Sequence, residues 1–217
     1  MMRKENVQFY LSVDGNTEEL YFKWLKERLN SSPNAVRTVS FDIKQKKPSS
    51  YAKSLSVLTE TIAYHVCDKE TSSISDKEKF KRTLAEMKDI HKIRPCITYK
   101  LAYSNISFEL WLLLHKTPCN GIKKTASDYF PNIKKTFSLD GVVSFNEYKE
   151  EKNFNRVLSQ LSLKDVKEAI KRAEEIQRNN VAVQQETVYK GYSFFEDNPS
   201  LNIHCLIQKI FDASEGR

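Results

Sequence analysis

Short apolar runs alternate with amphipathic stretches over the first half of the chain, and this alternation restricts the fold more than any other feature. Residues 7–13 are rich in Val, Phe, Tyr and Leu and end abruptly at Asp14, which predicts a strand. A helix is predicted over 16–30, because Asn16 or Thr17 can cap it and apolar residues then recur on one face. The first unit is therefore a strand and a helix with an acid between them.

The same alternation continues to residue 115. Strands are predicted at 36–43, 63–67 and 96–103, and helices at 50–62, 75–94 and 108–115. The first of these helices includes Leu58 at helical spacing. The second is expected to start at a capping box formed by Ser75 and Glu78 and to turn His91 inward. The third is apolar on nearly every side, which predicts a buried helix.

Strands that alternate with helices of this length predict an α/β fold with a mainly parallel, Rossmann-like sheet of about four strands and helices on both faces. We expect residues 1–115 to form this core and residues 116–217 to form a loop-rich and helical extension, packed on it as one compact unit. In the extension, Ser162 and Asp165 predict one helix start, and Asn198-Pro199 precedes a last helix.

The composition excludes several kinds of site. None of the 5 Gly is followed by Lys, so the chain has no P-loop, and any ATP hydrolysis must come from a partner. Isolated cysteines argue against structural zinc and for reduced thiols; they are Cys67, Cys96, Cys119 and Cys205. The N-terminal apolar run is too short for a signal peptide or a membrane span. We therefore expect a cytoplasmic location.

The formal net charge of +7 suits a polyanionic partner. Five bases and one acid lie between Arg37 and Lys53, and five bases and one acid lie between Lys116 and Lys135. One interpretation is a surface that binds nucleic-acid phosphates beside an anionic site; the other is a pair of solvated lysine-rich loops. The candidate nucleic-acid-binding residues are Lys44, Lys46, Lys47, Lys123, Lys124, Lys134 and Lys135.

Three acids follow predicted strands. Asp14 follows the first, and Asp68 and Glu70 follow the third. In an extended segment Asp68 and Glu70 would point the same way while Lys69 faces away. Parallel sheets bind ligands at the carboxyl ends of their strands, and Mg²⁺ or Mn²⁺ prefers such oxygen ligands. The three acids are therefore candidate metal ligands and catalytic residues, although a D-x-E sequence is also common in solvated turns.

A second group of candidates surrounds the apolar segment SFELWLLL, in which Glu109 is the one charge. A buried carboxylate needs a partner. The structural interpretation is a hydrogen bond or an ion pair with a lysine; the functional one is a catalytic or supporting role near Ser104. His115 ends the segment and either caps it or takes part in catalysis. Glu18, Ser104, Asn105 and His115 complete the set as supporting residues.

Four blocks, in order along the chain, carry a family resemblance: FYLSVDGNTEELYFKWL, HVCDKE, LAYSNISFELWLLLH and NPSLNIHCLIQKI. They resemble the RloB-like and AbiLii-like family of Toprim-domain proteins. The resemblance implies a Toprim-like metal-dependent catalytic domain from bacterial anti-phage defence or abortive-infection loci, often beside an ATPase partner. The family pattern has Glu at the position of Asp14 and Asp at the position of Glu70.

We therefore expect a Mg²⁺-dependent or Mn²⁺-dependent nuclease that hydrolyses phosphodiester bonds of DNA or RNA, including tRNA, and that can form a homo-oligomer. The alternative is a non-catalytic subunit that binds nucleic acid or an ATPase partner on a degenerate Toprim scaffold. Primase or topoisomerase activity is disfavoured, since the chain has no room for a strand-passage gate and no tyrosine with the context of a nucleophile.

Overall fold

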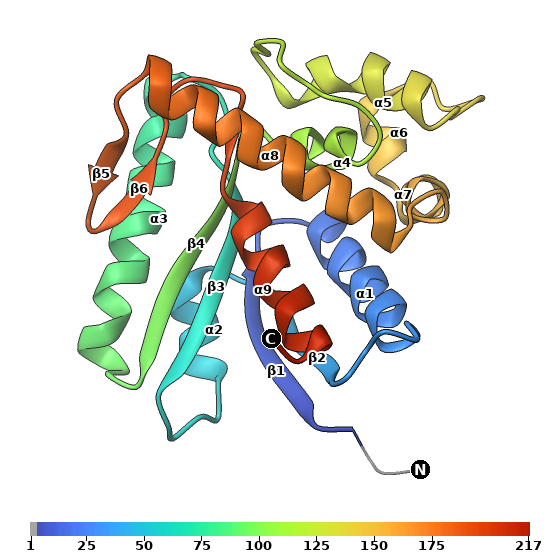
Figure 1. The fold of residues 1–217 in the computed structure, drawn as a ribbon. Helices are drawn as coiled ribbons and strands as arrows, with labels where there is room; N and C mark the ends of the chain where they lie inside the picture. The colour runs from blue at the N-terminus through green and yellow to red at the C-terminus, as the bar shows by residue number, and fades with distance from the viewer. Residues whose placement is uncertain (1–3) are drawn as a thin grey trace.

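The computed structural model describes residues 4–217, so the first three residues of the N-terminal stretch discussed above lie outside it. Five strands form one sheet in the order β2-β1-β3-β4-β7 (Figure 1). They are β1 (Asn6–Val13), β2 (Thr38–Gln45), β3 (Thr61–Asp68), β4 (Ile97–Asn105) and β7 (Ser200–Leu201). The first four are parallel, and β7 is antiparallel to β4. The predicted α/β class with a mainly parallel sheet is confirmed, with one more strand than expected.

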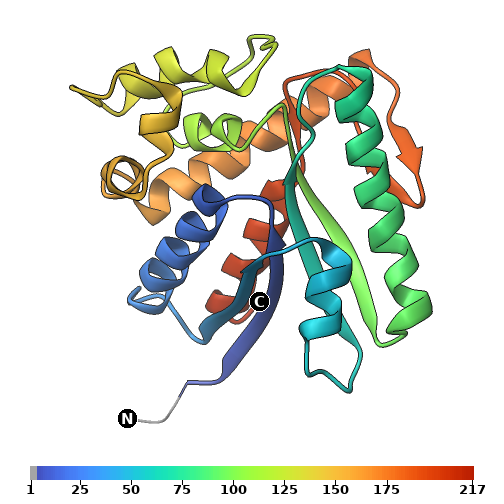
Figure 2. The same cartoon turned by 180° about the vertical axis from the view of Figure 1, so that it is seen from behind.

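Helices cover both faces of the sheet, as predicted (Figures 1 and 2). One face is covered by α1 (Asn16–Asn30) and α9 (Ile203–Glu215), with α8 (Leu163–Val183) packed across α9; the other is covered by α2 (Pro48–Ser54) and α3 (Ile74–Ile93). Val66 and Cys67, which are neighbours on β3, are buried in the two opposite cores. Burial on both faces explains why the central strands are nearly continuous apolar runs.

Two predicted boundaries are wrong. β2 begins at Thr38, and Val36 before it is 60% exposed. The helix predicted over 50–62 ends at Ser54, and Leu58 is 97% exposed. The Arg94 guanidinium donates hydrogen bonds to the backbone oxygens of Leu55 and Val57, 3.0 Å each. These bonds hold an extended segment in place of the helix that the apolar spacing suggested.

The start of α3 also differs from the prediction. Ser73 caps the helix by accepting a hydrogen bond from the Asp76 amide, so the cap lies two residues before Ser75. His91 is exposed, and Ile90 takes the buried position on that turn. The capping box of α8, formed by Ser162 and Asp165, is confirmed.

The last helix of the predicted core is α4 (Glu109–Leu114). The region after it contains η1 (Ala126–Tyr129), α5 (Phe130–Thr136), α6 (Phe145–Lys149) and α7 (Glu151–Leu158). This region, expected to be loop-rich, is therefore more regular than predicted. Tyr129, Ile133, Phe137 and Tyr148 are each fully buried, and their burial fixes these short helices. The group lies beyond the carboxyl ends of β1 and β3 (Figure 1).

Three short strands follow α8. β5 (Thr187–Tyr189) and β6 (Tyr192–Phe194) form a hairpin beside α3, and β7 joins the main sheet (Figure 1). The sequence analysis did not find these strands, and the last helix begins at Ile203 rather than directly after Pro199. Across residues 4–217, every helix is too short or too polar to cross a membrane.

Candidate active site

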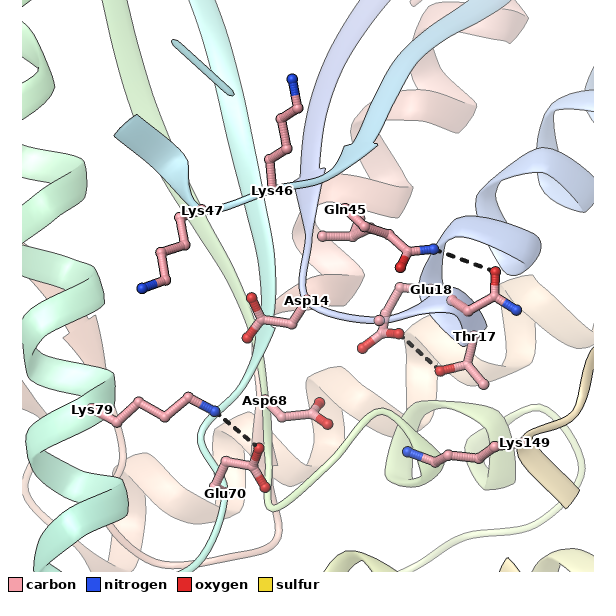
Figure 3. A pocket seen from close by; sticks show the side chains of 13 residues that line it. Asp14, Thr17, Glu18, Gln45, Lys46, Lys47, Asp68, Glu70, Lys79 and Lys149 are labelled. Carbon is pink, nitrogen blue, oxygen red and sulfur yellow. Dashed lines mark hydrogen bonds and ion pairs between the residues drawn. The ribbon is translucent and has the colours of Figure 1, made fainter. Parts of the chain in front are cut away.

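A cleft with a volume of about 500 Å³ opens at the carboxyl ends of β1 and β3 (Figure 3). Carboxylates and amines face each other across it. Its charged lining residues are Asp14, Glu18, Asp68, Glu70, Lys46, Lys47, Lys79 and Lys149. The structure thus brings the three predicted acids to one cleft and adds Glu18 to them, because the β1 and β3 ends are neighbours in the sheet.

The turn between β1 and α1 presents two of these acids. Asp14 ends the strand with its side chain 42% exposed. Glu18 lies one turn into α1, is 3% exposed, and accepts a hydrogen bond from Thr17 Oγ1 at 2.8 Å. A Cβ on Gly15 would lie 2.7 Å from Glu18 Oε2. Glycine at this position therefore leaves the space that the Glu18 carboxylate needs.

Asp68 and Glu70 reach the same cleft by a different backbone route from the one predicted. β3 ends at Asp68, and Glu70 has a φ of 64° in the left-handed region, which breaks the alternation of an extended segment. The side chain of Lys69 turns inward and is 2% exposed. Its Nζ binds the Glu196 backbone oxygen at 3.0 Å and Oε2 of the same residue at 3.1 Å. Glu70 in turn lies 3.5 Å from Lys79 Nζ.

The acids repel one another strongly. Burial, and then the carboxylates of Glu18 and Glu109, raise the pKa of Asp68 well above its ordinary value. Burial raises the pKa of Glu18 from 4.5 to about 7. The cleft therefore holds four carboxyl groups close together, two of them with raised pKa values, and a bound cation would stabilise their charged forms.

Glu109 lies behind the cleft and is fully buried at the start of α4. Its Oε1 lies 3.4 Å from Lys149 Nζ, which comes from the end of α6. In the described chain neither oxygen of Glu109 receives a hydrogen bond. Burial tends to lower the pKa of Lys149, but attraction to Glu109 and the other acids outweighs it and raises that pKa. The predicted ion pair between Glu109 and a lysine is confirmed, with Lys149 as the partner.

Lys149→Met is expected to lower the free energy of unfolding by about 2 kcal/mol in metal-free buffer, because it leaves the buried Glu109 carboxylate without its partner. The value is at the low end for buried pairs, since the Lys149 side chain is 35% exposed. Denaturant unfolding measures it. The double variant Lys149→Met/Glu109→Gln removes both charges and should recover most of the loss. A double variant as unstable as the single one would contradict the assigned pair.

A buried histidine on the neighbouring strand contacts Asp14. His65 Nε2 lies 3.4 Å from Asp14 Oδ1, and His65 Nδ1 lies 2.9 Å from Ser12 Oγ. His65 is 1% exposed and Ser12 is fully buried. The ring thus lies between the Ser12 hydroxyl and the Asp14 carboxylate, and it contacts Oδ1 of an acid that lines the cleft.

His65→Leu should reduce the rate of metal-dependent cleavage about tenfold, because it removes the polar contact that orients Asp14, a candidate metal ligand. His65→Gln places an amide nitrogen near the position of Nε2 and should retain most of the activity. Both variants lose the contact with Ser12, so the difference between them isolates the bond to Asp14. Cleavage rates, with thermal midpoints as a check on folding, test this. Equal losses in both variants would show that His65 does not position Asp14.

One comparison with known proteins decides the family. The family model described as RloB-like protein matches residues 9–210, which include β1 through most of α9. The chain belongs to the RloB-like protein family. No curated protein and no solved structure matches it.

The residues of the SFELWLLL region have structural partners in this RloB-like chain. Ser104 and Asn105 pair with β7, and Asn105 Nδ2 also donates to Glu196 O at 3.1 Å. His115 is buried between Trp111 O and Tyr21 OH, and burial lowers its pKa to about 4. None of these three predicted residues lines the cleft in the described part of the chain.

The predicted basic residues separate into two groups. Lys46 and Lys47 line the cleft, and Lys44 is the second-last residue of β2, which ends at Gln45. Lys123 and Lys124 precede η1, and Lys134 and Lys135 lie on α5; these four do not line the cleft. Lys79 and Lys149, which do line it, were not among the predicted residues. The sequence indicated that a buried Glu109 would need a partner such as a lysine, but it did not show that Lys149 is the lysine concerned.

The residues of the cleft fit a divalent cation in charge and ligand type. Glu109 has Lys149 as its ion-pair partner, whereas burial and the neighbouring acids disfavour the charged form of Asp68, which a cation would favour. Within residues 4–217, no three His, Cys, Asp or Glu side chains are already arranged as a metal site. Mg²⁺ usually keeps several waters and needs only one or two carboxylates, so Asp68 with Asp14 or Glu70 suffices.

Proposed function

We propose that this RloB-like protein is a divalent-metal-dependent nuclease whose active site is the acidic cleft. The observation that carries the proposal is the convergence of Asp14, Glu18, Asp68 and Glu70 in one cleft at the carboxyl edge of the sheet. Buried acids with raised pKa values that lie in a cleft mark a candidate functional site.

The residues have separable roles in this proposal. Asp68 and Glu70 hold the metal, and Asp14 acts as a third ligand or as the group that removes a proton from the attacking water. When bound, Mg²⁺ or Mn²⁺ lowers the pKa of that water and neutralises charge on the scissile phosphate. Lys149 Nζ points into the acids in Figure 3 and can donate to a phosphate oxygen, while Glu109 keeps it in place.

The substrate class follows from the charges around the cleft. Lys46 and Lys47 lie above the acids, with the Lys46 side chain directed away from them, and Lys79 lies on the opposite side from Lys149 (Figure 3). Cations on several sides of an acidic centre suit a phosphate backbone that crosses it. We propose DNA or RNA as the substrate, bound through phosphates.

A role as an effector of anti-phage defence, working with an ATPase partner, belongs to the same proposal. It is supported by the family resemblance together with the lack of a P-loop in the sequence. The ATPase would supply regulation, since the cleft itself is open to solvent. Nuclease activity that rises when a purified ATPase partner and ATP are added would support this part.

The rival function is a non-catalytic nucleic-acid-binding or ATPase-binding subunit on a degenerate scaffold. Incubation with single-stranded DNA, duplex DNA and tRNA, with Mg²⁺, Mn²⁺ or a chelator, separates the two functions. The nuclease cleaves at least one substrate only when metal is present. Calorimetry that finds no Mg²⁺ or Mn²⁺ binding, together with uncleaved nucleic acid, would favour the binding subunit.

A further inference from the structure

A second pocket, of about 390 Å³, lies at the amino-terminal end of β4, away from the acidic cleft. It is bounded by α3, β4 and the β5–β6 hairpin, which lie side by side in Figure 1. Four basic side chains converge on it: Lys88 and His91 from α3, Lys100 from β4 and Lys190 from the hairpin. Among the described residues that line it there is no Asp or Glu. Its charge is thus opposite to that of the cleft acids.

Backbone donors of β4 face the same pocket. β7 pairs with β4 at Ser104 and Asn105 alone, and Asn202 then binds both the N–H and the C=O of Tyr103. Backbone groups of alternate residues point to the same side of a strand, so those of Tyr99 and Leu101 point to this outer edge as well. No strand of the described chain covers them there.

The β5–β6 hairpin covers the outer edge of β4 only in part. Tyr192 OH donates to Tyr99 O at 3.4 Å, which leaves the Tyr99 N–H free of a strand partner in the described chain. An unpaired N–H surrounded by lysines is a donor set for an anion.

Lys190 occupies a backbone position that lysine does not favour. It has a φ of 55° and Gly191 has a φ of 86°, so together they form a two-residue turn with two left-handed residues. Asn or Gly is preferred at the first position of such a turn, and lysine costs about 1 kcal/mol there. The turn therefore places Lys190 beside the pocket in a backbone conformation that lowers the stability of the fold.

We propose that this pocket binds a phosphate group of an anionic ligand. Favourable interaction with the helix dipole explains cations near the end of α3, where Lys88 and His91 lie, but it does not explain Lys100 or Lys190. Two acids of α3 lie near the pocket without lining it: Asp89 is paired with Lys92 at 2.6 Å, and Glu86 accepts a hydrogen bond from the Ser49 amide. The ligand is either a small phosphate compound or a backbone phosphate of a nucleic acid. The inference does not depend on metal binding at the acidic cleft.

Amide NMR spectra of the full chain, recorded with a chelator and increasing inorganic pyrophosphate, test the site. The amides of Tyr99 and Leu101 should shift. The variant Lys100→Ala/Lys190→Asn should bind pyrophosphate about tenfold more weakly, because two charge-assisted contacts are lost. Lys190→Asn alone should keep or raise the thermal midpoint, since Asn suits the turn, so weaker binding cannot be attributed to unfolding.

Lys92→Ala is the matched control, because Lys92 lies on the same helix but outside the pocket. Unmoved Tyr99 and Leu101 amides, or a loss in Lys92→Ala equal to that in the double variant, would overturn the proposal. A short single-stranded oligonucleotide identifies the source of the phosphate. If it shifts the same amides and competes with pyrophosphate, the ligand is a nucleic-acid backbone; if pyrophosphate alone binds, the ligand is a small phosphate compound.

Discussion

Asp68→Asn is expected to abolish metal-dependent cleavage while the protein stays folded. Loss of a ligand that positions the metal removes several kcal/mol of transition-state stabilisation, which corresponds to about a thousandfold in rate. Burial and the neighbouring acids raise the pKa of Asp68, so its charged form destabilises the metal-free fold. The variant should therefore unfold at the same temperature as the wild type or higher. Cleavage rates and thermal scans on the same preparations measure both effects.

Asp140→Asn is the control for this experiment, because Asp140 is exposed and does not line the cleft. It should leave the rate unchanged. Cleavage by Asp68→Asn at the wild-type rate would remove Asp68 from the active site. Loss of cleavage with a lower melting temperature would instead mean that Asp68 stabilises the fold.

Glu18 should make the metal-free protein less stable as the pH rises. Burial raises its pKa from 4.5 to about 7, so the folded protein holds this proton more tightly than the unfolded chain does. The contribution to stability is complete below pH 4.5 and is lost as the pH rises through about 7. The size of the shift corresponds to about 3 kcal/mol. Denaturant unfolding at a series of pH values in a chelating buffer measures it.

Glu18→Gln removes the titration, so above pH 7 it should be more stable than the wild type. Glu19→Gln is the matched control on the next residue. Burial alone would raise the pKa of Glu19, but Lys23 and Gln45 together outweigh it and lower that pKa, so the loss of Glu19 should destabilise the protein at neutral pH. The two variants should thus differ in sign. Identical pH profiles for them would contradict the distinction between Glu18, whose neutral form is favoured, and Glu19, whose charged form is favoured.

The sequence was sufficient for the parts of the fold that depend on local pattern. The apolar runs ending at Asp14 and Asp68 predicted the two strands whose ends form the cleft, because parallel strands place their carboxyl ends at one edge. The sequence was insufficient where a contact with a distant residue determines the backbone conformation. Arg94 holds residues 55–57 extended against their helical spacing, and nothing near Leu58 indicates this.

The same limit applies to the candidate site. Glu18 could be placed one turn into a helix, but its burial and raised pKa depend on α4 and α6, which are distant in sequence. Lys149 lies in a region of short helices whose apolar residues show no clear helical spacing. Its position beside Glu109 therefore follows from tertiary packing, which the sequence pattern does not show. His65 was a polar residue in an apolar strand, and only the pairing of β1 with β3 brings it to Asp14.

The anchor of Lys69 on Glu196 joins the loop that carries Asp68 and Glu70 to a segment 127 positions later in the chain. Local opening of that later segment would therefore also release the loop, even while the central strands stay folded.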